Sequence, residues 1–228
     1  MNKQRILTKV TGIGQMIITF IVYALVQGVF MIRAKQLSMI TVIFIFGLTI
    51  ALLSLIYEIY QRRLNQQNAW HFTSYSKSRM PKFSLKNWGY AFLGFLVICV
   101  LQILAGFLLK GEATNQATIA IHQQQLNPII NVMLVVIAPI FEEIIFRGIF
   151  FNWFFSDKPN SKATVFLAVL INGLIFGLLH EPQIDLFTGL YTLCGCVLAT
   201  VYLKTKDLTF SYAAHLCNNL TVFLISGL

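Results

Sequence analysis

The sequence predicts an all-α membrane protein, a polytopic bundle of about seven transmembrane helices (six to eight) with an intramembrane polar cavity. The chain is 57% hydrophobic and only 11% charged, and its mean hydropathy is +0.73. Apolar runs of about 20 residues, the length that crosses a bilayer, recur along it. The later runs also contain charged and polar side chains. Such side chains persist within a membrane when they pair, face a water-filled cavity or take part in chemistry.

Seven apolar segments are expected to span the membrane. They lie near residues 12–32, 38–60, 87–109, 128–152, 164–180, 185–203 and 208–227. The first is too long for a cleavable signal peptide, and no small-residue cleavage site follows it before Arg33, so we expect it to remain as a helix. The fifth and sixth are short and share the polar stretch Glu181-Pro182-Gln183, so we expect either of them to be tilted or broken.

The distribution of positive charge predicts the topology. If the N-terminus is cytoplasmic, the cytoplasmic segments contain most of the 17 Lys and Arg residues, namely Lys3, Arg5, Lys9, Arg62, Arg63, Lys77, Arg79, Lys82, Lys86, Lys158, Lys162, Lys204 and Lys206. The outer segments contain only Arg33, Lys35 and Lys110. Because Lys and Arg favour cytoplasmic loops, we expect an integral membrane protein with a cytoplasmic N-terminus. The net charge of +9 then needs no nucleic-acid partner, and membrane lipid is the expected surrounding.

The chain divides into two unequal parts. Residues 1–110 are expected to form N-terminal transmembrane helices and a basic cytoplasmic loop at 62–86. That loop mixes cations with aromatic residues such as Trp70 and Phe72, as headgroup layers favour. We therefore interpret it as a membrane-surface loop rather than as a partner-binding site. Residues 111–228 contain nearly all of the intramembrane polar side chains and are expected to form the functional core.

The first polar patch is Glu142, Glu143 and Arg147, within one predicted helix. Neighbouring helical residues point about 100° apart, so the two glutamates have different surroundings. Glu143 and Arg147 are four residues apart, with the acid on the N-terminal side, which is the favourable order for an ion pair. Glu142 is left without a local cation, and a carboxylate removed from water is a better base toward a water molecule. Pro139 is expected to kink the helix or to start a new one. The alternative for this patch is a buried network that only locks helices together.

The second patch is Asn172, Phe176 and His180, which recur every four residues and line one face of a helix. Gly173 and Gly177 on the same helix form a small-x-x-x-small pair, which allows another helix to approach closely. A single histidine at a helix end is more often an interfacial residue than a catalyst, so this patch alone does not decide between structure and function.

The third patch is His215 with Asn219, again four residues apart on one face. An imidazole N–H beside an amide N–H is able to hold a developing oxyanion. The alternative is a hydrogen-bonding pair between membrane helices.

The three patches together contain the parts for amide hydrolysis without a serine or cysteine nucleophile. A carboxylate activates water, a histidine positions it, and a His/Asn pair stabilises the tetrahedral intermediate. Glutamate and histidine are also zinc ligands, but the chain has no His-Glu-x-x-His sequence. We therefore expect no cofactor, while a divalent metal such as zinc stays open. The four cysteines lie in apolar spans and are interpreted as small apolar residues: Cys99, Cys194, Cys196 and Cys217.

Three sequence motifs resemble those of one family. They are Glu-Glu-x-x-x-Arg at 142–147, Phe-x-x-x-His at 176–180 and His-x-x-x-Asn at 215–219. In this order they resemble the CPBP family (CAAX protease and bacteriocin-processing, or Abi) of intramembrane endopeptidases, over about residues 128–228. The resemblance implies a multi-helix membrane fold with its site in a cavity, and it favours a metal-free glutamate peptidase. It also implies a role for each motif residue: Glu142 as the general base, His180 as its helper, His215 and Asn219 as the oxyanion site, and Glu143 and Arg147 as supporting residues.

We therefore expect an intramembrane endopeptidase that acts on a membrane-proximal peptide or protein, in bacteriocin maturation, self-immunity or CAAX-type processing. The size and the simple loops favour a bacterial cell membrane. Two alternatives stay open. One is a non-catalytic bacteriocin immunity or partner-binding membrane protein of the same fold. The other is a transporter or channel, because intramembrane Glu and Arg also mark ion paths, although the sequence has no inverted repeat.

Overall fold

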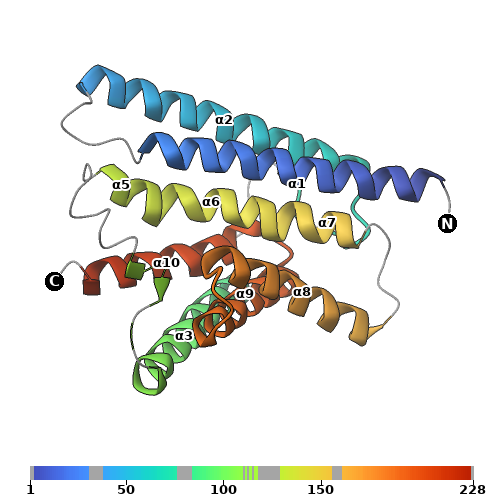
Figure 1. The fold of residues 1–228 in the computed structure, drawn as a ribbon. Helices are drawn as coiled ribbons and strands as arrows, with labels where there is room; N and C mark the ends of the chain where they lie inside the picture. Colours follow the sequence, from blue (N-terminus) through green and yellow to red (C-terminus); the bar gives the residue numbers. More distant parts are fainter. Residues whose placement is uncertain are drawn as a thin grey trace.

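A computed structural model describes residues 3–30, 38–75, 84–109, 111, 113–114, 116–117, 129–155 and 161–226. Most residues in these ranges are helical, and six helices are long and apolar enough to cross a membrane. They are α1 (Lys3–Phe30), α2 (Met39–Gln66), α3 (Leu85–Leu108), α8 (Lys162–His180), α9 (Leu186–Thr205) and α10 (Leu208–Ser226), as Figure 1 shows. They correspond to six of the seven predicted spans, and the structure confirms the all-α membrane bundle.

The predicted span at 128–152 is also helical, but it is built in pieces. It consists of α5 (Ile129–Val132), the π-helical segment η2 (Met133–Ile137), α6 (Ala138–Glu142), a second π-helical segment η3 (Glu143–Ile149) and α7 (Phe150–Phe154). We call this run the interrupted helix. Pro139 lies in the first turn of α6, where its missing N–H is tolerated best. The residues before this proline, Ile137 and Ala138, keep right-handed helical dihedral angles, so the helix continues through Pro139 and does not start anew there.

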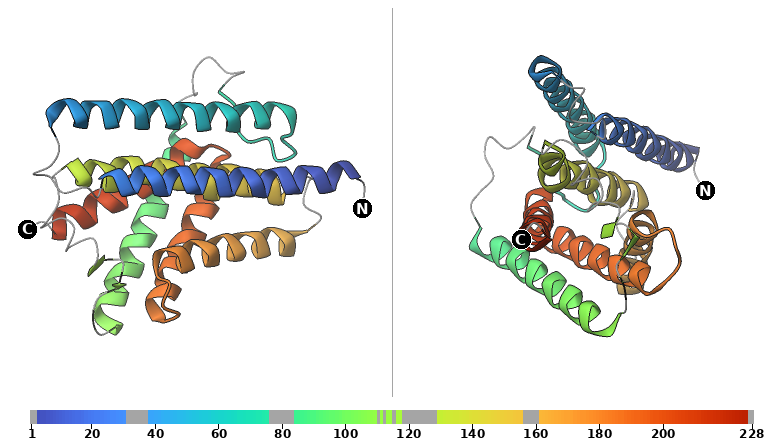
Figure 2. Two further views of the ribbon diagram at one scale, coloured as in Figure 1. Left: turned by 45° about the horizontal axis from the view of Figure 1, so that its top comes forward. Right: turned by 60° about the vertical axis from the view of Figure 1, so that its left-hand side comes forward.

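The interrupted helix lies at the centre of the bundle. It runs beside α1 on one side and beside α10 on the other, and α2 lies next to α1 and also contacts η3 (Figures 1 and 2). Helices α3 and α9 lie side by side and cross the direction of α1 and α2 steeply, and α8 packs along α9. The main hydrophobic core joins residues of α1, α2, the interrupted helix, α8 and α9. The interrupted helix therefore presents its side chains to α1, α8 and α10 at once.

Large apolar side chains cover the outer faces of the long helices. Examples are Phe44 on α2 at 69% exposure and Phe107 on α3 at 84%. A soluble protein rarely exposes apolar surface on this scale, whereas a lipid bilayer solvates it. The long apolar helices and their exposed apolar faces together make this chain an integral membrane protein.

Two aromatic residues of the basic loop, Trp70 and Phe72, pack against the protein core, which corrects the interpretation of that part of the loop as a membrane-surface segment. Phe72 is buried and stacks on Tyr202 with 4.5 Å between ring centroids. Trp70 packs on Phe155 at 4.6 Å, and the ammonium of Lys206 lies 4.0 Å from the centre of the Trp70 ring. Packing against Tyr202 and Lys206 removes the apolar ring surface from solvent and adds stacking and cation–π contacts, which exposure would not provide. The rest of the loop, at 76–83, lies outside the described residues.

Helices α8 and α9 pack unusually closely, as the glycine spacing predicts. A Cβ atom at Gly173 would lie 2.6 Å from the carbonyl oxygen of Thr192, and one at Gly177 would lie 2.7 Å from that of Thr188. Both glycines are therefore required for the close approach. The polar stretch after His180 forms the turn between the two helices and breaks neither of them. This turn is fixed by Thr188, whose hydroxyl donates to the carbonyl of Gln183 at 2.6 Å.

Replacing Gly177 by leucine is expected to lower the thermal unfolding temperature of the protein in detergent or lipid nanodiscs. The added side chain meets backbone atoms of α9, which move only if the two helices separate, and overpacking of this kind destabilises by about 1–3 kcal/mol or more. The matched control is Gly189→Leu on α9, because a Cβ there meets nothing within 4 Å. Equal unfolding temperatures for the two variants would contradict the close packing.

Candidate active site

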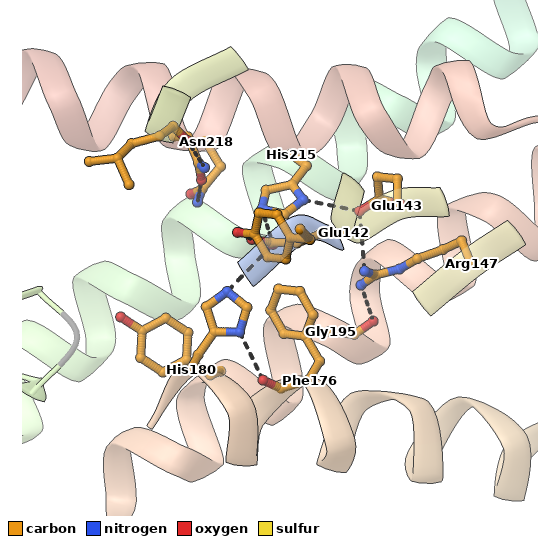
Figure 3. A network of polar contacts seen from close by, with 12 residues as sticks. Glu142, Glu143, Arg147, Phe176, His180, Gly195, His215 and Asn218 are labelled. Atoms are coloured by element: carbon orange, nitrogen blue, oxygen red, sulfur yellow. Dashed lines mark hydrogen bonds and ion pairs between the residues drawn. The ribbon is translucent and has the colours of Figure 1, made fainter. Parts of the chain in front are cut away.

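Five ionisable side chains from three parts of the bundle meet at the centre of the protein (Figure 3). The interrupted helix contributes two acids and one base, and α8 and α10 contribute one histidine each: Glu142, Glu143, Arg147, His180 and His215. His180 is the last residue of α8, and the close approach of α8 to α9 fixes that helix end. The structure thus brings together five of the six residues singled out from the sequence.

Glu142 lies between the two histidines. Its Oε2 atom is 3.5 Å from Nε2 of His180 and 3.7 Å from Nε2 of His215. Its other oxygen, Oε1, accepts a hydrogen bond of 2.7 Å from the hydroxyl of Tyr23 on α1. The side chain of Glu142 is only 9% exposed, so these neighbours account for most of its surroundings.

Glu143 faces a different set of partners, as the angle between neighbouring helical residues predicts. Its Oε1 atom lies 3.2 Å from Nη1 of Arg147, so the predicted ion pair is confirmed. The same oxygen accepts a hydrogen bond of 3.0 Å from Nδ1 of His215. Arg147 is fully buried and also donates from Nη2 to the carbonyl of Gly195 on α9, at 3.1 Å. The carboxylate of Glu143 therefore links the buried cation to the imidazole of His215.

The sequence indicated the Glu143–Arg147 pair but not the bond from Glu143 to His215. The two residues are 72 positions apart, and no local spacing relates them. The sequence also predicted that His215 pairs with Asn219 on its own helix, so no particular partner on another helix was predicted for it.

The predicted face of α8 is confirmed, and its three residues have different surroundings. Asn172 donates from Nδ2 to the carbonyl of Phe146 at 2.6 Å, inside η3. This buried hydrogen bond anchors α8 to the interrupted helix. Phe176 stacks on His180 with 4.0 Å between ring centroids and meets His215 edge-on at 5.9 Å. It therefore separates the two imidazoles and orients both.

The hydrogen bonds at Nδ1 determine the tautomers of the two histidines. His180 Nδ1 lies 2.9 Å from the carbonyl oxygen of Phe176, which only accepts, so this nitrogen carries a proton. His215 Nδ1 likewise donates to the carboxylate of Glu143. In each neutral ring, Nε2 then holds a lone pair that points at Glu142.

Three acceptor atoms consequently converge on one point. They are the two Nε2 atoms and Oε2 of Glu142, which is buried and has no hydrogen-bond partner among the described residues. Lone pairs that face one another in a site of low dielectric repel unless a donor lies between them. A water molecule, which offers two O–H groups, or a proton on one of the imidazoles completes such a set.

Glutamate and two histidines are also a donor set that zinc accepts. Across the described ranges, however, no group of three His, Cys, Asp or Glu side chains has the spacing to hold a metal ion. The distances of 3.5 Å and 3.7 Å from Glu142 to the two imidazoles are longer than a typical direct hydrogen bond, and all three atoms are within reach of one water molecule placed beside them.

Asn219 lies one turn beyond His215 on α10, as its spacing predicts, but its contacts are with other residues. Its Nδ2 atom donates to the carbonyl of Leu134 in η2 at 3.1 Å, and its Oδ1 accepts from Asn218 at 3.4 Å. Within the described part of the chain, no contact joins Asn219 to Glu142. One of its two amide hydrogens is committed to Leu134, which leaves the other for a further partner.

The site is most open on the side of His180. That side chain is 19% exposed, against 6% for His215. Tyr191 on α9 stacks against the imidazole of His180 at 5.3 Å between centroids, and its hydroxyl accepts from the amide of Gln116 at 3.3 Å. His180 is the most exposed of the five ionisable side chains.

This arrangement defines a class: a membrane helix bundle with a buried Glu/His/His site and a supporting Glu–Arg pair. Residues 124–221 match the family described as "Type II CAAX prenyl endopeptidase Rce1-like". This match and the similar proteins below support the resemblance of the three motifs to the CPBP family of intramembrane proteases.

Two bacterial proteins are similar to this chain. The chain is 32% identical over 142 residues to the "Putative membrane peptidase YdiL" of Bacillus subtilis strain 168, covering 60% of this chain and 55% of that protein. It is 25% identical over 146 residues to the "Membrane-embedded CAAX protease MroQ" of Staphylococcus aureus strain USA300, covering 61% of this chain and 57% of that protein. The chain thus spans about half the length of the curated relatives it matches. No solved structure matches it.

Replacing Glu143 by glutamine is expected to destabilise the protein strongly. Arg147 would remain buried with its charge unpaired, and breaking one side of a buried pair typically lowers the free energy of unfolding by about 3–5 kcal/mol. The double variant Glu143→Gln/Arg147→Met should recover part of that loss, because both charges are then removed. Thermal unfolding in lipid nanodiscs measures both effects.

The matched control is Glu58→Gln, which breaks another pair of the same spacing, with Arg62 at 2.9 Å on α2. Both side chains of that pair are more than half exposed, so its loss should lower stability by less than about 1 kcal/mol. Similar losses of stability in Glu58→Gln and Glu143→Gln would show that burial does not make the Glu143–Arg147 pair more important for stability than an exposed pair.

Proposed function

We propose that this protein is an intramembrane endopeptidase that hydrolyses a peptide bond of a membrane-proximal peptide or protein with a water molecule activated by Glu142. The observation that carries the proposal is the position of Glu142 Oε2, which lies 3.5 Å from Nε2 of His180 and 3.7 Å from Nε2 of His215. The names of the similar proteins, a membrane peptidase and a CAAX protease, support the same class of reaction.

In the proposed reaction, Glu142 removes a proton from the bound water while the water oxygen attacks the carbonyl carbon of the substrate. A tetrahedral intermediate forms with its negative charge on the former carbonyl oxygen. The C–N bond then breaks, and the proton held by Glu142 passes to the departing amine nitrogen. His180, held at Nδ1 by the carbonyl of Phe176, keeps the water in line through its Nε2 atom.

His215 and the free amide hydrogen of Asn219 form the proposed oxyanion site. His215 needs a proton on Nε2 for this role, since its Nδ1 proton is committed to Glu143. In the proposed reaction the adjacent carboxylate of Glu143 stabilises the positive charge on the ring of His215, and Arg147 holds that carboxylate in place. The two supporting residues thus act on the reaction through His215.

A metal is not required by this mechanism. A test follows from it: a chelator such as EDTA or 1,10-phenanthroline should leave the rate of peptide cleavage unchanged in purified, lipid-reconstituted protein. The donor set would otherwise hold zinc through Glu142, His180 and His215, and the metal would supply the activated water. Activity that disappears on chelation and returns with added zinc would replace the metal-free mechanism.

The proposed substrate lies at the membrane surface or within the membrane, because the helices that surround the site are long and apolar enough to cross a membrane. CAAX-type processing, bacteriocin maturation and self-immunity all supply a peptide of this kind. The positive charge of the predicted inner loops supports a cytoplasmic N-terminus in a bacterial cell membrane.

Replacing Glu142 by glutamine should abolish cleavage of a fluorogenic membrane peptide in proteoliposomes, with a fall in kcat of roughly 100- to 10,000-fold. Glutamine keeps the size of the side chain but is not a base. The control is Glu58→Gln, whose carboxylate lies on an exposed face of α2. Undiminished turnover by Glu142→Gln would overturn the proposal. If Glu142→Gln cleaves no peptide but still confers bacteriocin immunity, the result would favour the non-catalytic immunity or partner-binding protein instead.

A further inference from the structure

Tyr23 on α1 is the only hydroxyl group that bonds to Glu142 among the described residues. Its hydroxyl donates to Oε1 at 2.7 Å, and its side chain is 8% exposed. The ring stacks on Phe141 at 5.3 Å between centroids, with an angle of 27° between the ring planes. Phe141 directly precedes Glu142, so the same turn of the interrupted helix holds both the ring and the hydroxyl of Tyr23.

The hydrogen bond from Tyr23 distinguishes the two oxygens of Glu142. The terminal torsion of a glutamate is soft, so an unrestrained carboxylate exchanges its oxygens. Here Oε1 is committed to the tyrosine, whereas Oε2 faces the two histidines without a hydrogen-bond partner. The plane of the carboxylate, and with it the direction of its free lone pairs, is therefore fixed from the side opposite the imidazoles.

The part of α1 that carries Tyr23 packs firmly on the interrupted helix. Tyr23, Val26 and Phe30 belong to the main buried core together with Phe141 and Ile145. The hydroxyl thus reaches Glu142 from a rigid helix rather than from a mobile loop, as a positioning group requires. Residue 23 lies outside the segment 124–221 that matches the family, so this contribution to the site comes from the N-terminal part of the chain.

We propose that Tyr23 is a positioning residue for the hydrolysis, which holds the Glu142 carboxylate with Oε2 directed at the water molecule between His180 and His215. This inference rests on the proposed peptidase function. Tyr23 does not touch the reacting atoms. It acts through Glu142, and it makes the N-terminal helix a working part of the site rather than only a membrane anchor.

The test is Tyr23→Phe in the full chain, reconstituted in lipid and assayed with the fluorogenic membrane peptide. Phenylalanine keeps the stacking on Phe141 and removes only the hydroxyl. We expect kcat to fall roughly 10- to 100-fold, the equivalent of losing a hydrogen bond to a charged group, with KM nearly unchanged. With kcat normalised to the concentration of folded protein, a loss confined to kcat is not produced by a change in substrate binding alone.

The matched control is Tyr60→Phe, which also removes one buried tyrosine hydroxyl. Tyr60 lies on α2 and its hydroxyl is 3.1 Å from that of Tyr202, away from Glu142. This variant should keep the kcat of the unaltered chain. Equal kcat values for Tyr23→Phe and the unaltered chain, or equal losses in Tyr23→Phe and Tyr60→Phe, would overturn the positioning role.

A double-variant cycle on thermal stability separates this inference from the proposed function. Tyr23→Phe should lower the unfolding temperature in the unaltered chain and have a smaller effect in Glu142→Ala, because its partner is then absent. Equal effects in both backgrounds would show that the bond is not made and would overturn the inference even if the peptide is cleaved. A smaller effect of Tyr23→Phe in Glu142→Ala would show that the hydrogen bond is made. If the protein nevertheless cleaves no peptide in a Glu142-dependent way, the peptidase function is overturned, and the positioning role with it.

Discussion

The structure depends on the burial of one ion pair, Glu143 with Arg147, at the centre of a membrane bundle. Both side chains are almost completely removed from solvent, and their atoms lie 3.2 Å apart. Charges in such surroundings persist only when they are paired and hydrogen-bonded. The pair meets this condition through the carbonyl of Gly195 on α9 and the imidazole of His215 on α10. Three helices are thereby held around one buried carboxylate, and its neighbour Glu142 is free for other partners.

The irregular backbone of the interrupted helix fits this arrangement. The π-helical segment η3 begins directly after Glu142, and Asn172 of α8 bonds to a carbonyl within it. Such segments re-aim side chains relative to a regular helix and are frequent at functional sites. Close glycine-mediated packing of α8 on α9 then brings His180 to the same point. The close packing and the buried ion pair therefore favour the same geometry, in which the imidazoles of His180 and His215 lie next to the carboxylate of Glu142.

Much of this was predictable from local spacing. The apolar runs indicated the helices, and the four-residue intervals indicated the Glu143–Arg147 pair and the polar face of α8. The glycine pair on that helix indicated its close packing. Contacts between distant segments were not predictable in the same way. The bond from Glu143 to His215 and that from Tyr23 to Glu142 join residues 72 and 119 positions apart, and only the packing of the bundle creates them. The burial of Trp70 and Phe72 was missed for the same reason, since composition alone favoured the membrane surface.

The central claim is that Glu142 acts as a base toward water and not as a nucleophile. A single-turnover reaction in ¹⁸O-enriched water, with enzyme in excess over a membrane peptide, tests it directly. Mass spectrometry of both the cleaved peptide and the protein segment that contains Glu142 locates the label. We predict one ¹⁸O atom in the new carboxyl group of the product and none in Glu142. Label in the Glu142 carboxylate would indicate a covalent anhydride intermediate, and it would contradict the activated-water mechanism.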